Sequence, residues 1–173
     1  LELAPVPEML EIALDVHPED VCLVPERREE RTTEGGLDLI KKFYDIKKIS
    51  DDLTNAGIRV SLFIAPEIDQ IDKAIQMQVP IIELHTGNYA DFDGELKNKE
   101  LKKIQQAVEY AKKAGLLVNA GHGLHYENVQ NIAKIDGIHE LNIGHAIVAK
   151  ALFIGWENAV IEMKKIIKEY AQS

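Results

Sequence analysis

The sequence has 173 residues, of which 46% are hydrophobic and 28% are charged. This composition is typical of a folded globular domain and excludes a disordered chain, a collagen and a disulfide-rich mini-protein. The formal net charge of −9 disfavours nucleic acids and anionic membranes as partners, and the apolar runs are too short to span a bilayer. The single cysteine, Cys22, cannot form an internal disulfide, so we expect the protein to be cytoplasmic. The length predicts a single domain over residues 1–173.

Short apolar runs alternate with longer amphipathic stretches along the chain. The runs are apolar at most positions, as expected of parallel strands covered on both faces, and the stretches repeat apolar residues at helical spacing. The predicted strands are Leu1–Ala4, Val21–Val24, Arg59–Ala65, Pro80–Thr86, Leu116–Ala120 and Glu140–Ile143. The predicted helices are Pro7–Val16, Asp38–Ala56, Glu67–Met77, Leu96–Ala114, Tyr126–Ile135, Ala146–Phe153 and Trp156–Tyr170, with Trp156 and Tyr170 expected in the core.

The alternation of strands and helices predicts a parallel sheet, either an open doubly wound sheet or a (β/α)₈ barrel. An open sheet carries one phosphate loop near its first strand. Here polar residues follow nearly every strand, which is typical of a barrel. We therefore predict an α/β fold of the (β/α)₈ (TIM) barrel class. Only six strand–helix units are present, so we expect the chain to be the C-terminal three quarters of the barrel, with two units preceding Leu1.

Two segments near the start carry charged groups with alternative roles. Glu2 lies in an apolar run, where a buried charge is costly unless it is paired or used; the alternative is a solvent-facing residue at a frayed edge. The segment Arg27–Gly36 combines arginines and Thr32 with two closing glycines. It predicts a lid that is mobile without ligand and closes over a phosphate ester, or else a solvated loop with local ion pairs.

Glu83 and His85 lie two residues apart in a predicted strand, so their side chains face the same side. A carboxylate beside an imidazole suits acid–base chemistry at neutral pH, and it equally suits metal ligation. A hydrogen-bonded structural pair is the third possibility.

Two glycine-containing turns follow the last two predicted strands. His122 lies between Gly121 and Gly123, which allows a ligand to approach the backbone closely, although a turn that merely requires glycine fits the same pattern. Gly144 and His145 precede a predicted helix, whose first N–H groups form an anion site. Barrel enzymes often bind phosphate at these two strands.

Four segments together resemble the pyridoxine 5′-phosphate synthase family over essentially the whole chain. They are VPERREE at residues 24–30 with TTEGG at 32–36, ELHTGNYA at 83–90, VNAGHGL at 118–124 and ELNIGHA at 140–146. The resemblance implies a (β/α)₈ barrel that condenses 1-deoxy-D-xylulose 5-phosphate with 3-amino-2-oxopropyl phosphate. The products are pyridoxine 5′-phosphate, phosphate and water. It also implies a homo-octamer that needs no metal or organic cofactor.

The resemblance further implies roles for individual residues. Glu2 matches a proton acceptor, His122 a proton donor, and Glu83 a residue that stabilises a transition state. Thr32 matches a contact to the xylulose phosphate. The matches for contacts to the aminoacetone phosphate are Gly123, Gly144 and His145.

The chain departs from the family pattern at several positions. Family chains begin two strand–helix units earlier, with a further catalytic histidine and phosphate-binding arginines. Arg31 stands where a small aliphatic residue is usual, Arg27 replaces a lysine, and His125 replaces a common asparagine. Two alternatives therefore stay open: a metal-dependent barrel hydrolase or aldolase, with ligands Glu2, Glu83, His85 and His122, and a non-catalytic ligand-binding fragment.

Overall fold

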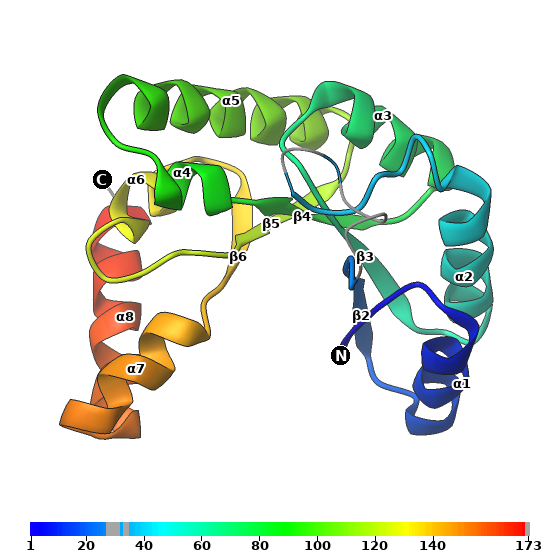
Figure 1. Cartoon of the computed structure of the whole chain (residues 1–173), viewed down its shortest axis with the longest axis horizontal. Helices are drawn as coiled ribbons and strands as arrows, with labels where there is room; N and C mark the ends of the chain where they lie inside the picture. The colour runs from blue at the N-terminus through cyan, green and yellow to red at the C-terminus, as the bar shows by residue number, and fades with distance from the viewer. Residues whose placement is uncertain (27–31, 33–34, 172–173) are drawn as a thin grey trace.

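The computed structural model describes residues 1–26, 32 and 35–171. Its six strands form one sheet in the order β1-β2-β3-β4-β5-β6, and every neighbouring pair is parallel (Figure 1). The strands are β1 (Glu2–Leu3), β2 (Asp20–Leu23), β3 (Arg59–Ile64), β4 (Ile81–His85), β5 (Leu117–Gly121) and β6 (Ile138–Asn142). The helices are α1 (Pro7–Val16), α2 (Phe43–Asn55), α3 (Ile68–Met77), α4 (Gly87–Asp91), α5 (Gly94–Lys113), α6 (Val129–Ala133), α7 (His145–Ile154) and α8 (Trp156–Ala171).

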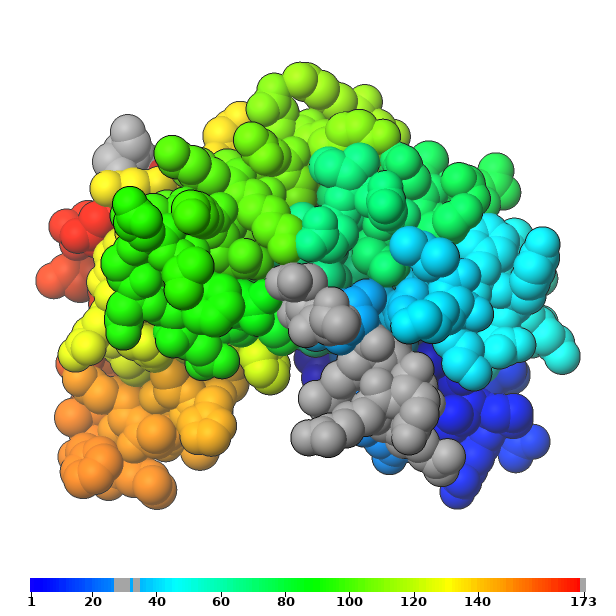
Figure 2. Space-filling model, turned by 45° about the horizontal axis from the view of Figure 1, so that its top comes forward, coloured from blue at the N-terminus to red at the C-terminus, as the bar shows by residue number. Residues whose placement is uncertain are grey.

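The sheet curves into an arc with the helices along its outer side, which confirms the predicted TIM-barrel class (Figure 1). Strands β1 and β6 are the two ends of the strand order. In the space-filling view open space lies beside α7, in orange, on the side that faces the N-terminal part of the chain (Figure 2). None of the helices within the described residues is long and apolar enough to cross a membrane.

The two faces of the sheet differ in polarity, contrary to the prediction of strands apolar on both sides. Outward-facing residues such as Leu23, Leu62 and Ile82 are fully buried and form the hydrophobic core against the helices. The strand register brings a different set together on the inner face, because side chains alternate along a strand. That set is mostly polar and includes Cys22, Ser61, Phe63, Glu83, Asn119 and Glu140, beside the apolar Ile81 and Leu117.

Two further predictions about the helices were wrong in detail. Helix α2 begins at Phe43 and not at Asp38. The Asp38 carboxylate accepts the Lys41 N–H at 3.1 Å and the Gln70 side chain accepts the Leu39 N–H at 2.8 Å, so a turn precedes the helix. Trp156 lies outside the core, with 62% of its surface exposed, because it starts α8, which buries only residues further along.

Candidate active site

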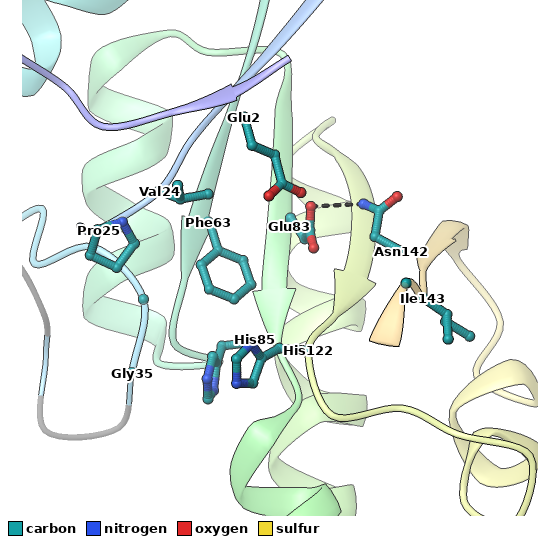
Figure 3. A pocket seen from close by; sticks show the side chains of 12 residues that line it. Glu2, Val24, Pro25, Gly35, Phe63, Glu83, His85, His122, Asn142 and Ile143 are labelled. Carbon is teal, nitrogen blue, oxygen red and sulfur yellow. Dashed lines mark hydrogen bonds between the residues drawn. The ribbon is translucent and has the colours of Figure 1, made fainter. Parts of the chain in front are cut away.

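A cavity of about 550 Å³ opens at the carboxyl ends of the strands. Because parallel strands end on the same side of a sheet, residues far apart in the sequence face it. Glu2 reaches it from β1, Glu83 from β4, and His122 from the turn after β5, so three predicted site residues converge (Figure 3). The other lining residues are Val24, Pro25, Gly35, Gly36, Phe63, His85, Asn142, Ile143 and Gly144.

Glu83 is the most perturbed acid of the cavity. It is only 5% exposed, and the pKa of its carboxyl is raised from 4.5 to about 7, chiefly by burial. The negative charge of Glu2 contributes to this rise, whereas a hydrogen bond from Asn142 opposes it: the Asn142 Nδ2–H donates to Oε2 at 2.7 Å (Figure 3). The Cys22 thiol donates to the same oxygen at 3.7 Å. A carboxyl group with a pKa near 7 can accept and return a proton at neutral pH.

For Glu2 the sequence left open a charge that is used in the site and a solvent-facing residue at a frayed edge, and the structure shows features of both. It belongs to a strand at the end of the sheet and its side chain is exposed, yet the carboxylate points into the cavity towards Glu83 (Figure 3). Two facing carboxylates disfavour double ionisation. The charge of Glu2 therefore favours the protonated form of Glu83.

His85 and His122 form an aromatic stack at the other side of the cavity. Their ring centroids lie 4.7 Å apart with 25° between the planes, and Phe63 meets His85 edge-on at 5.3 Å. The Gly87 N–H donates to Nδ1 of His85 at 3.3 Å, which leaves the proton of a neutral His85 on Nε2. A side chain at Gly35 would place its Cβ 2.7 Å from this ring, so the close approach requires glycine there.

Metal ligation is the other chemistry that Glu2, Glu83, His85 and His122 could serve. In the part of the chain that the structure describes, no three His, Cys, Asp or Glu side chains are placed to share a metal ion. The carboxylates lie at one side of the cavity and the imidazoles at the other (Figure 3). This arrangement favours proton transfer by separate side chains.

A second hollow of about 430 Å³ adjoins the main cavity and shares His122 and Gly144 with it. Gly123 and His145 line this second hollow, so the structure brings the three predicted aminoacetone phosphate contacts together. Gly144 is the N-cap of α7, and the first N–H groups of a helix have no partner within it. This end of α7 can therefore donate hydrogen bonds to an anion.

Thr32 is not brought to the main cavity. Its hydroxyl donates to the Gly35 carbonyl at 2.7 Å, and its side chain lines a separate hollow with Asp38 and Gln70. Most of the predicted lid, including Arg27, lies outside the described residues. Gly35 and Gly36, which end that segment, do line the main cavity.

Sequence reasoning missed three residues of the cavity region: Phe63, Asn142 and Cys22. Asn142 belongs to a segment already quoted, but nothing in the sequence pairs it with Glu83. Alternation was the available signal, because Cys22 lies between the outward-facing Val21 and Leu23 and must therefore face inwards. Phe63 follows from the same rule, since Leu62 and Ile64 are buried on the outer face.

Comparisons with known proteins agree with this architecture. The solved structures that resemble the chain include a xylose isomerase domain protein from Planctomyces limnophilus, with a TM-score of 0.53 and 15% identity. They also include a variant of mandelate oxidase with 2-hydroxy-phenylacetamide, with a TM-score of 0.57 and 12% identity. These matches cover 95% and 98% of this chain but only 66% and 55% of the two other chains, and at such low identity they show the fold alone.

The sequence identifies the family more specifically than the fold does. A family model described as "Pyridoxal phosphate biosynthesis protein PdxJ" matches residues 1–169. This match contains all the strands and the residues that line the cavity. The chain belongs to the PdxJ family of pyridoxal phosphate biosynthesis proteins.

Proposed function

We propose that the protein is a pyridoxine 5′-phosphate synthase. It condenses 1-deoxy-D-xylulose 5-phosphate with 3-amino-2-oxopropyl phosphate, and it releases pyridoxine 5′-phosphate, phosphate and water. The observation that carries the proposal is the convergence of Glu2, Glu83 and His122 on one cavity, which adjoins a second hollow at the start of α7.

The chemistry needs several proton transfers in one enclosed place. The amine of one substrate attacks the ketone of the other, and water leaves as the imine forms. Later dehydration and ring closure each require a proton to be removed from carbon and another to be given to a leaving oxygen. Side chains placed at hydrogen-bond reach and titrating near neutral pH perform such steps best.

The residues divide these tasks by position and chemistry. Glu2 is exposed to the cavity and acts as a proton acceptor. His122 acts as a proton donor, and its place after β5 puts it within reach of both hollows. Glu83 stabilises the charge that develops during the reaction, since it is fixed by Asn142 and has a pKa of about 7.

Two phosphorylated substrates require two anion sites. Gly123, Gly144 and His145 line the hollow at the start of α7 and bind the aminoacetone phosphate. Thr32, which lines a separate hollow in the structure, and the predicted lid bind the xylulose phosphate once the lid closes. Closure of this kind also excludes water from reactive intermediates.

The test is a product assay with the complete protein. Both substrates together should give pyridoxine 5′-phosphate and inorganic phosphate in equal amounts, and omission of either substrate should give neither. The His122→Asn variant is the matched control for contaminating activity. Absence of pyridoxine 5′-phosphate from a folded preparation, or phosphate release that needs only one substrate, would contradict the proposal. Sedimentation of the same preparation tests the accompanying proposal that the protein assembles as a homo-octamer.

A further inference from the structure

The turn after β5 has a backbone conformation that histidine rarely adopts. His122 has φ of 80°, in the left-handed region, and Gly123 follows with φ of 77°. Glycine enters this region freely, whereas a residue with a Cβ does so at a steric cost. Such conformations persist where the surrounding structure holds them, and they cluster at functional sites. A contact outside the turn must therefore stabilise His122.

Thr86 supplies that contact from the end of β4. It is completely buried, and its Oγ1 lies 2.8 Å from the Gly121 carbonyl and 2.7 Å from the His122 carbonyl. The hydroxyl proton is shared between the two acceptors, since a threonine donates only one. The Thr86 N–H also donates to the Gly121 carbonyl at 2.8 Å. Removal of the hydroxyl would leave the Gly121 carbonyl with its hydrogen bond from the Thr86 N–H. The His122 carbonyl would lose its hydrogen bond from the Thr86 side chain.

We propose that Thr86 is a positioning residue whose hydroxyl holds the turn after β5 so that the His122 imidazole points into the cavity. The proposal deepens the proposed function and rests on it. Thr86 does not line the cavity, so it acts through His122 and not on the substrate.

The neighbours of Thr86 support this role. His85 precedes it in the chain, and its ring stacks on His122 at 4.7 Å. The end of β4 therefore holds both parts of His122: Thr86 holds its carbonyl and His85 its ring. Gly87 completes the arrangement, because a Cβ there would collide with the His85 ring and come within 3.0 Å of the His122 ring.

The test compares Thr86→Val, Thr86→Ala and Thr86→Ser in the complete protein. Valine keeps the shape and loses the hydroxyl, while serine and alanine differ by a single oxygen atom. We expect kcat to fall about tenfold or more in the valine and alanine variants, with KM within about threefold of the wild type. The serine variant should stay within about threefold in both constants. Thr54→Val, at an exposed position of α2, is the matched control and should change neither constant.

A packing role predicts a different pattern. If serine were as impaired as alanine, the methyl group would matter and the proposal would be wrong. A valine variant with kcat within about threefold of the wild type would also overturn it. Failure of both hydroxyl-free variants to fold would assign Thr86 to the fold alone and equally overturn the proposal.

Crystal structures separate this proposal from the proposed function. If the wild type makes no pyridoxine 5′-phosphate, the proposed function fails and the role of Thr86 is judged on geometry. We expect the Thr86→Val structure to show His122 outside the left-handed region or its ring no longer stacked on His85. An unchanged φ and an unchanged stack would refute the proposal whatever the reaction is.

Discussion

Replacement of Glu83 by glutamine should make the protein more stable at alkaline pH. Burial and the charge of Glu2 raise the pKa of the Glu83 carboxyl from 4.5 to about 7. One pKa unit corresponds to about 1.4 kcal/mol, so ionised Glu83 costs the folded state about 3 kcal/mol relative to the unfolded chain. Glutamine has nearly the same shape, can accept the hydrogen bond from Asn142, and carries no charge.

The sign of the pH dependence follows from proton binding. Between pH 4.5 and about 7 the folded state holds the Glu83 proton more tightly than the unfolded state. The contribution of Glu83 to the free energy of unfolding therefore falls as pH rises through this window, and the loss is complete above pH 7. The Glu83→Gln variant lacks this dependence. Its stability relative to the wild type should rise by about 2 to 3 kcal/mol between pH 5 and pH 8.5.

Urea denaturation of both proteins at pH 5 and pH 8.5 measures this difference. A constant offset from the substitution cancels, because only the change with pH is compared. The Glu11→Gln variant, at an exposed position of α1, corrects for removal of one negative charge from a chain of net charge −9. A Glu83→Gln advantage that is equal at the two pH values would refute the reasoning. The same variant should have little of the proposed synthase activity at either pH.

Three further predictions concern the cavity. His122→Asn should lower turnover by about 10² to 10⁴-fold. The denaturation midpoint should change little, because asparagine tolerates the left-handed backbone. Turnover within about threefold of the wild type would contradict the role of His122. Burial strongly raises the pKa of the Cys22 thiol, so iodoacetamide at pH 8 should alkylate the folded protein at least about tenfold more slowly than the urea-unfolded protein. Mass spectrometry measures both rates, and equal rates would show that the thiol is accessible in the folded protein. Treatment with a chelator should leave turnover within about threefold of the untreated enzyme, whereas loss of activity with release of a stoichiometric metal would favour the metal-dependent alternative.

Much of the architecture could be predicted from hydrophobic periodicity and from the proline and glycine residues that bound helices and turns. The order of strands and helices, Pro7 at the start of α1 and the glycines around His122 are local features, and the structure has them where they were expected. The glycine-flanked His122 and the segment at Gly144 were also visible, because strand ends in a parallel sheet share one edge. The start of α2 and the exposure of Trp156 were not, since both depend on what packs nearby.

The sequence by itself determined the alternation of strands and helices, the family, and which segments meet at the carboxyl edge of the sheet. Only the tertiary structure decided which inner-face side chains touch. An apolar run predicts a strand that is packed against helices. It does not predict that Cys22 and Glu83 face a polar interior. The pKa of Glu83 depends on Asn142, 59 residues away, and the His122 carbonyl accepts a hydrogen bond from Thr86, 36 residues away. Such pairs arise from the register between strands, which is set by the packing of the whole sheet and not by local sequence.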